Sequence, residues 1–160
     1  DDEAIEAVFQ RKQYEVVAER LGLSGRGLGQ WEEAIAGDTP VFIVGFPRAL
    51  ASWTAEVIDN RHTASFNLLL PKVGEVAEGT QRAHNVTQLK AKFRALGLSR
   101  QLGWYADAIA YPGCKSAGFG LGLERLAMWL FGLKNIRQVH PIYRDTKFSE
   151  IPTTGPEEAS

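Results

Sequence analysis

Three glycines, Gly118, Gly120 and Gly122, alternate with apolar residues and are followed by Arg125. If residues 118–123 form a strand, its side chains alternate between two faces, so one face carries only hydrogens. A bare strand face packs poorly unless something flat lies against it. Arg125 would stand in the first turn of the next helix, where amide donors and the helix dipole favour an anion. The run therefore predicts the floor of a nucleotide site beside a phosphate-binding arginine.

The apolar residues of the same run, Phe119, Leu121 and Leu123, are expected to bury the opposite face of the strand. The alternative interpretation is a glycine-rich hairpin packed tightly on a helix, in which the glycines serve packing alone. Two other phosphate-binding patterns do not apply. Leu123 breaks the G-x-G-x-x-G pattern, and residues 113–116 lack the upstream glycine of a phosphate loop.

A second group of residues suited to chemistry lies in the segment 66–82. The carboxylate of Glu75 is a ligand type that hard cations prefer, and the planar guanidinium of Arg82 suits two-point capture of an oxygen-bearing group. Because seven positions separate them, a regular strand would point them to opposite faces. A β-bulge, or a turn near Gly79, is needed to bring both toward one cleft. The alternative is a solvated strand end with ordinary charges.

The bulk composition bounds the class of protein. The chain has 160 residues, of which 44% are hydrophobic, enough for one domain with a sizeable core. A net charge of −1 argues against a surface that coats nucleic acid. The single cysteine, Cys114, permits no internal disulfide, which is typical of a reducing compartment. No apolar run approaches the ~18 residues of a membrane span, so we expect a cytoplasmic protein without a membrane partner.

The three histidines, His62, His84 and His140, are scattered and lack the spacing of metal ligands. We expect them to be surface or capping residues. Cys114 has no histidine placed beside it by the sequence, so nucleophilic catalysis there is a weak hypothesis.

Strand-like and helix-like segments follow one another in an order typical of an α+β fold, an antiparallel sheet flanked by helices. We expect one domain over residues 1–152 and a polar tail over 153–160. In the first half of the chain we expect a helix from Asp1 or Asp2 to about Leu21, a short helix at 31–35, a buried strand at 41–46, and a hairpin of 55–58 and 63–70 that turns at Asp59. In the second half we expect a strand at 73–80, a helix that Asn85 caps and Gly97 ends, a helix at 99–108, the glycine strand, and a helix at 124–131.

The two blocks together resemble class II aminoacyl-tRNA synthetases of the asparaginyl/aspartyl branch. Residues 116–126 are similar to motif 3 of that family, and residues 66–82 are similar to a signature of the branch, with its Gly-Glu step and closing Gln-Arg. The buried strand ending in Phe46-Pro47, the segment 104–107, and the segments 132–137 and 143–145 follow in the family's order. The resemblance covers roughly residues 40–145 and implies the C-terminal half of a class II catalytic domain.

The resemblance implies ATP and Mg²⁺ as cofactors and a small amino acid as substrate, with transfer RNA among the candidate acceptors. It also implies a homodimer formed through regions outside this chain. The roles carried over are adenine and ribose support by Gly118, Gly120 and Gly122, a γ-phosphate contact by Arg125, Mg²⁺ binding by Glu75, and capture of the substrate's side-chain carbonyl or carboxylate by Arg82 with Gln81.

Several positions depart from the family pattern. Asn67 stands where the family has an aspartate, Ala51 replaces a basic residue, residues 109–110 replace an Arg-Arg pair, and residues 115–116 replace Pro-His. Each change removes charge or a polar tip near the expected cleft. These departures put ordinary charging of transfer RNA in question.

Nothing in the chain resembles motif 1, which builds the family's dimer interface, or motif 2, whose arginine grips the α-phosphate. Adenylate formation needs that charge in the transition state, so this chain alone is expected to bind ATP weakly and not to activate an amino acid. Because its only methionine is Met128, we also expect it to begin inside a longer polypeptide. Three hypotheses stay open: an asparagine- or aspartate-tRNA ligase, a tRNA-independent amide or amine ligase, and a non-catalytic synthetase-like binding domain.

Overall fold

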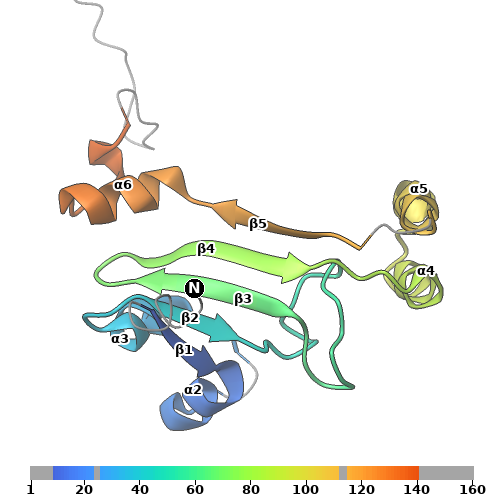
Figure 1. The fold of residues 1–160 in the computed structure, drawn as a ribbon, viewed down its shortest axis with the longest axis horizontal. Helices are drawn as coiled ribbons and strands as arrows, with labels where there is room; N and C mark the ends of the chain where they lie inside the picture. The colour runs from blue at the N-terminus through green and yellow to red at the C-terminus, as the bar shows by residue number, and fades with distance from the viewer. Residues whose placement is uncertain (1–8, 24–25, 112–114, 141–160) are drawn as a thin grey trace, which may run out of the picture.

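A five-stranded sheet forms the centre of the computed structural model, which describes residues 9–23, 26–111 and 115–140. Its order is β1-β2-β3-β4-β5, and the neighbouring pairs are antiparallel except β1 and β2, which are parallel (Figure 1). The α+β class is confirmed, with one parallel pair that the sequence does not predict. The strands are β1 (Gln10–Gln13), β2 (Val41–Val44), β3 (Ser65–Leu70), β4 (Gly74–Gln81) and β5 (Ala117–Leu121).

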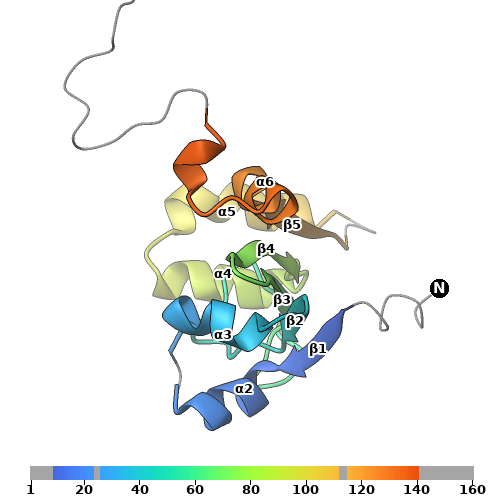
Figure 2. The same cartoon turned by 90° about the vertical axis from the view of Figure 1, so that its left-hand side faces the viewer.

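The helices gather in three places around the sheet (Figures 1 and 2). The first lies beside β1 and the second packs against β3 and β4, two more pack on each other beyond one end of the strands, and the last follows β5 at the opposite end. In that order they are α2 (Tyr14–Leu21) and α3 (Glu32–Ala36), the latter preceded by the 3₁₀ turn η1 (Gly29–Trp31); α4 (Val86–Ala95) and α5 (Ser99–Ile109); and α6 (Leu123–Phe131), followed by the 3₁₀ turn η2 (Ile136–Gln138).

Three apolar clusters hold these layers together. In the largest, the fully buried Val41 and Ile43 of β2 pack with Tyr14 of α2 and Ile35 of α3. The second cluster joins the β3–β4 hairpin to α6, and the third joins α4 to α5. Their buried members are Leu70, Val76 and Ala77 in the second, and Leu89, Phe93 and Ala106 in the third.

The prediction of one helix that runs to about Leu21 is wrong for residues 10–13. Residues 1–8 lie outside the described part of the chain, residues 10–13 form β1, and the helix begins only at Tyr14. The segment Gln10–Gln13 is polar, so apolar periodicity gives no signal for a strand there. It joins the sheet through its backbone, pairing Gln10 with Val41, and its charged side chains suit an exposed edge.

The other expected elements are confirmed except at residues 55–58, which form isolated bridges rather than a strand. Asn85 caps α4, because its Oδ1 accepts a hydrogen bond of 3.0 Å from the amide of Gln88. Gly97 follows the end of that helix with a positive φ of 69°. Cys114, residues 143–145 and the predicted tail at 153–160 lie outside the described residues.

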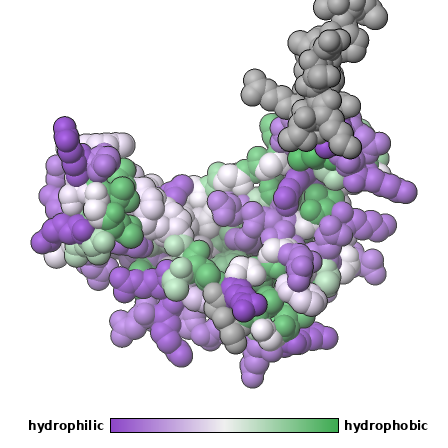
Figure 3. All heavy atoms as spheres, turned by 180° about the vertical axis from the view of Figure 1, so that it is seen from behind, coloured by the Kyte–Doolittle hydropathy of each residue, from purple (hydrophilic) through white to green (hydrophobic). Residues whose placement is uncertain are grey.

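The apolar side of β5 differs from the prediction. Phe119, Leu121 and Leu123 have exposed fractions of 69%, 41% and 66%, so the expectation that they are buried is wrong for this chain. β5 is the last strand of the sheet, and within the described ranges no sixth strand pairs with its outer edge. In Figure 3 the surface is hollowed between the α4–α5 pair and α6. In the part of the chain that the structure describes, no helix is long and apolar enough to cross a membrane.

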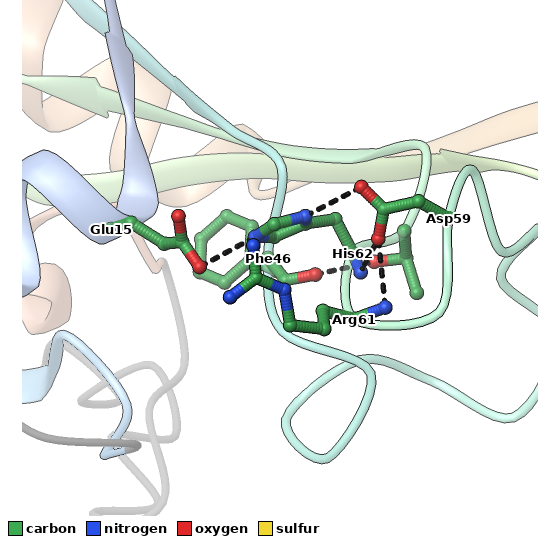
Figure 4. A network of polar contacts seen from close by, with 6 residues as sticks. Glu15, Phe46, Asp59, Arg61 and His62 are labelled. Carbon is green, nitrogen blue, oxygen red and sulfur yellow. Dashed lines mark hydrogen bonds and ion pairs between the residues drawn. The ribbon is translucent and has the colours of Figure 1, made fainter.

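His62 links α2 to the loop that precedes β3, and it is more than the surface residue that the sequence suggests (Figure 4). Its Nε2 lies 2.7 Å from Glu15 Oε1, and its Nδ1 lies 2.8 Å from Asp59 Oδ2. Asp59 Oδ1 also accepts bonds of 2.7 Å from the amides of Arg61 and His62. The hydrogen bond to Asp59, and then the one to Glu15, raise the pKa of His62. The hydrogen bond from His62 is the largest cause that lowers the pKa of Asp59 to about 2.

These shifts predict how the stability of the protein depends on pH. A raised folded-state pKa means that the contribution of His62 is fully present below its ordinary 6.5 and is lost as pH rises through the folded value. We expect His62→Gln to remove this loss, so that between pH 6 and 8.5 the Tm of the wild type falls further than that of the variant. Because the two carboxylates are exposed, the difference should be on the order of 1–2 °C, measured by circular dichroism.

His140→Gln is the matched control, since His140 makes a longer ion pair of 3.7 Å with Glu124. It should keep the wild-type pH slope. Equal slopes for the wild type and His62→Gln would contradict the role given to His62.

Candidate functional site

A β-bulge in β4 meets the geometric condition that the sequence sets for the site. The register pairs Leu68 with Ala77 but Leu69 with Glu75, so Val76 is one extra residue on β4. Paired residues share a face of the sheet, and the bulge therefore places Glu75 on the same face as Glu78. Thr80, paired with Ser65, continues that face toward Arg82.

A cavity of about 160 Å³ lies on this face, between the sheet and the loop that follows β2. Arg82 and Glu78 line it from β4, and Gly118 and Gly120 line it from β5. Arg82, Gly118 and Gly120 are thus brought together, as the sequence predicts. The remaining lining residues are Leu50, Ala51, Ser52, Ala55, Ser65, Gly79, Thr80 and Phe119.

Arg82 is held in place by neutral groups only. Its Nη1 donates a hydrogen bond of 2.6 Å to Thr54 Oγ1, and its Nη2 lies 3.2 Å from the point where a Cβ on Gly118 would stand. Within the described residues, no carboxylate lies within ion-pair distance of this guanidinium. Its positive charge is therefore available to a ligand in the cavity.

The three glycines of the run have different surroundings. Gly118 leaves room for the Arg82 side chain, and at Gly122 a Cβ would stand 3.6 Å from the Val76 carbonyl oxygen and 3.7 Å from Arg125 Cβ. Only at Gly120 would an added Cβ meet no atom within 4 Å among the described residues. The bare surface that could support a flat ligand is thus concentrated at Gly120, and the packing interpretation describes Gly118 and Gly122 better.

A second polar cluster lies beside the bulge, at the other end of β4. Arg125 Nη1 donates a bond of 2.6 Å to the carbonyl oxygen of Glu75 and lies 3.9 Å from Glu32 Oε2. Glu32 Oε2 also accepts a bond of 2.9 Å from the amide of Glu75. Asn67 Nδ2 donates to Glu75 Oε2, so the residue that replaces the family's aspartate touches the expected metal ligand. Arg125 and Glu75 are brought together here, but neither lines the cavity around Arg82.

The carboxyl group of Glu75 has a raised pKa. Burial is the largest cause, the negative charges of Glu32 and Glu78 add to it, and Arg125 and Asn67 oppose it. Across residues 9–23, 26–111 and 115–140, no group of three His, Cys, Asp or Glu side chains could hold a metal ion. Mg²⁺ in nucleotide sites is often bound by one or two carboxylates together with phosphates, so Glu75 fits a metal that arrives with its nucleotide.

The structure also shows where sequence reasoning was incomplete. Gln81 pairs with Ala117, which puts it on the face away from Arg82, and it does not line the cavity. Glu78, Thr54 and Glu32 were missed. Glu78 stands four residues before Arg82, which on a strand is a same-face spacing that could have been noticed. Thr54 and Glu32 lie 28 and 43 residues from their partners, and no local pattern reports such contacts.

Comparison with known proteins identifies the family. The model of the family "tRNA synthetases class II (D, K and N)" matches residues 2–145. The chain belongs to this family. The asparagine–tRNA ligase of Pelobacter propionicus is 38% identical over 163 residues, which cover 91% of this chain and 35% of that protein.

Solved structures of class II synthetases share the fold. Asparaginyl-tRNA synthetase from Pyrococcus horikoshii has a TM-score of 0.76 at 28% identity over 82% of this chain and 34% of its own. The Entamoeba histolytica enzyme in complex with asparaginyl-adenylate has a TM-score of 0.75 at 29% identity over 82% of this chain and 34% of its own. The chain spans about a third of the length of these relatives.

Two of the four departures from the family pattern border the site. Ala51 lines the cavity and Asn67 contacts Glu75. By contrast, Ile109 packs in the α4–α5 cluster, and residues 110, 115 and 116 do not line the cavity. The loss of charge at positions 51 and 67 therefore bears directly on what the site can bind.

The glycines offer a matched pair of variants that separates packing from open surface. A Cβ on Gly79 would stand 2.5 Å from Phe66 Cε1 and 2.7 Å from Phe119 Cβ, whereas one on Gly120 would touch nothing described. We expect Gly79→Ala to lower the free energy of unfolding by about 1–3 kcal/mol through overpacking. Gly120→Ala should change it by less than about 0.5 kcal/mol. Urea unfolding measures both, and an equal loss in the two variants would contradict the open surface at Gly120.

Proposed function

We propose that this chain is the C-terminal part of an asparaginyl-type catalytic domain that, in the intact protein, activates an amino acid with ATP through an acyl-adenylate. The observation that supports it most is the single cavity that is lined both by the guanidinium of Arg82, which makes no ion pair within the described residues, and by the open surface of Gly120. One group suits an oxygen-bearing side chain and the other suits a flat base or sugar. Because the chain belongs to the class II synthetase family, we take the oxygen-bearing side chain to be that of an amino acid and the base and sugar to be those of ATP.

Arg82 would select the amino acid by two-point bonding to its side-chain carbonyl or carboxylate. Thr54 supports this role by fixing Nη1 from the side, which leaves the rest of the guanidinium for the ligand. Arg82 can serve asparagine or aspartate. The names of the relatives favour asparagine.

ATP would lie along β5, with its flat part over Gly120 and its γ-phosphate toward Arg125. Arg125 stands in the first turn of α6, where the helix dipole also favours negative charge. Its Nη1 is occupied by the Glu75 carbonyl, and within the described ranges its other donors have no partner. Those donors are available for phosphate oxygens.

Mg²⁺ would be held by Glu75 together with phosphate oxygens, and when bound it supplies positive charge that neutralises the phosphates. The raised pKa of Glu75 supports this, because a nearby cation would offset the repulsion from Glu32 and Glu78. The α-phosphate contact is expected from a segment outside this chain. We further propose a cytoplasmic homodimer with transfer RNA as acceptor, on family membership alone.

A second candidate function is a non-catalytic synthetase-like binding domain, or a ligase that transfers the acyl group to an amine instead of transfer RNA. The substitutions at Ala51 and Asn67 favour it, because they remove charge at the cavity wall and at the Glu75 carboxylate. A site that lost polar groups can keep amino-acid binding through Arg82 while losing the chemical step.

The test is amino-acid-dependent ATP–pyrophosphate exchange by the intact protein, with asparagine and aspartate compared. Arg125→Ala should lower kcat/KM for ATP about 100-fold, because it removes charge that stabilises the phosphates. Arg82→Ala should raise KM for the amino acid and leave KM for ATP nearly unchanged. Arg100→Ala, an exposed arginine of α5 outside the cavity, is the control and should match the wild type.

Absence of exchange with either amino acid, combined with retained amino-acid binding, would favour the binding domain. Exchange that survives Arg125→Ala unchanged would contradict the proposed phosphate contact.

A further inference from the structure

The α4–α5 pair lies outside the cavity, but it contacts the loop that forms part of the cavity wall. Residues 104–107 of α5 follow the family pattern, and none of them lines the cavity. Tyr105 of this segment packs instead on Trp53, with the ring centroids 5.5 Å apart and an interplanar angle of 85°. Trp53 belongs to the loop 47–55 after β2, and its neighbour Ser52 lines the cavity. A segment that the proposed function leaves unused thus reaches the site through this loop.

Trp53 is anchored to both helices of the pair. Its ring also meets Phe93 of α4 edge to face, with the centroids 5.2 Å apart and an interplanar angle of 75°. Phe93 is buried in the α4–α5 cluster, so it offers a fixed surface. Lys92 Nζ donates a hydrogen bond of 3.2 Å to the carbonyl oxygen of Trp53. Because aromatic pairs prefer edge-to-face contact, the side chain and the backbone of Trp53 are both held in one position.

The next residue, Thr54, connects Trp53 to Arg82. The carbonyl oxygen of Thr54 accepts a bond of 2.7 Å from the amide of Ala83, and its Oγ1 accepts the bond of 2.6 Å from Arg82 Nη1. A guanidinium only donates hydrogen bonds, so the hydroxyl proton of Thr54 is free to bond Ser52 Oγ, which lies 2.9 Å away. Neither Trp53 nor Thr54 lines the cavity, so any effect of these two residues on a ligand must pass through their neighbours.

Arg82 depends on this support because no carboxylate holds it. Among the described residues, Thr54 is the one hydrogen-bond partner of its guanidinium. Two-point capture of an oxygen-bearing group requires the planar guanidinium in one orientation, and a long side chain loses conformational entropy when it is held so. If only a fraction of the molecules has the guanidinium in that orientation, the apparent dissociation constant rises in inverse proportion to the fraction.

We propose that Trp53 is a positioning residue that acts through Thr54 to orient the guanidinium of Arg82. This rests on the proposed function, in which Arg82 binds the side-chain end of an amino acid. The α4–α5 pair then supports the Arg82 end of the site from outside the cavity. Tyr105, and with it the segment 104–107, takes part in the site without touching the ligand.

The test uses the intact protein and two measurements that do not depend on catalysis. The first is the order parameter of the Arg82 Nε–H bond, from ¹⁵N relaxation of arginine-labelled protein without ligand. The signal of Arg82 is assigned by its loss in Arg82→Lys. The second is calorimetric titration with L-asparagine, L-aspartate and ATP, each alone.

Trp53→Leu keeps an apolar side chain but removes both edge-to-face contacts. We expect it to lower the order parameter of Arg82 from about 0.85 to below about 0.6. The dissociation constant of the amino acid that the wild type binds should rise about 5–20-fold, and that of ATP by less than about twofold. Trp53→Phe keeps a ring and should stay within about threefold of the wild type. Trp104→Leu, at a residue of α5 that is 66% exposed, is the control and should match the wild type.

A double-mutant cycle tests whether Trp53 acts through Thr54. Thr54→Val removes the hydroxyl at nearly the same shape and should reproduce the losses of Trp53→Leu. The double variant should lose no more than Thr54→Val alone, because both changes act on the same hydrogen bond. Lys92→Met removes the bond to the Trp53 carbonyl without touching the rings. It should lower the order parameter by a smaller amount, and it decides the outcome where Trp53→Leu does not fold.

An order parameter that is already low in the wild type, or that Trp53→Leu and Lys92→Met leave unchanged, would overturn the proposal. Losses that add in the double variant, or that affect ATP as much as the amino acid, would also overturn it, because they indicate general damage to the fold. A lowered order parameter in a protein that binds neither amino acid would uphold the role of Trp53 and reject the proposed substrate. Amino-acid binding that Arg82→Ala weakens and Trp53→Leu does not would support the proposed function and reject the role of Trp53.

Discussion

The extra residue Val76 is the constraint on which both ends of the site depend. Without it, Glu75 would leave the face that carries Glu78 and Arg82. The bulge also positions α6, because the Val76 carbonyl accepts a bond of 2.8 Å from the amide of Gly122, the residue before α6. The adjacent carbonyl of Glu75 accepts the bond from Arg125. A local irregularity in one strand thereby fixes an acidic group and a basic group next to each other.

The same bulge explains how this part of the fold is stabilised. Val76 and Ala77 are both nearly fully buried, which successive residues of a regular strand at a half-open sheet would not be. Both belong to the apolar cluster against which Leu126 of α6 packs, so burial of apolar surface holds the bulge in place. A Cβ added at Gly79 would collide with Phe66 and Phe119, whereas one added at Gly120 would meet no described atom. Two glycines on neighbouring strands thus serve opposite purposes, one close packing and the other an exposed surface.

The sequence predicts the parts of this arrangement that have a local signal. Apolar runs predict β2 and the α4–α5 pair, and the seven-residue spacing of Glu75 and Arg82 correctly requires a bulge. The sequence does not predict β1, because the residues of β1 are polar and pair with the sheet through their backbone. Nor does it predict the contacts of Thr54 with Arg82 or Glu32 with Glu75, because these depend on tertiary folding. The glycine alternation predicts a bare face, but only the structure shows that Arg82 covers part of it.

The outer edge of β5, which no strand among the described residues covers, sets what this part of the fold can do alone. An exposed strand edge with Phe119 and Leu121 beside it is a surface that proteins normally cover, since unpaired amides and apolar side chains invite association. The open surface of Gly120 lies on that same strand, so whatever covers the edge also borders the proposed nucleotide position. Under the proposed function, the segment that covers this edge of β5 also supplies the α-phosphate contact. Such a segment would complete the sheet and the site together.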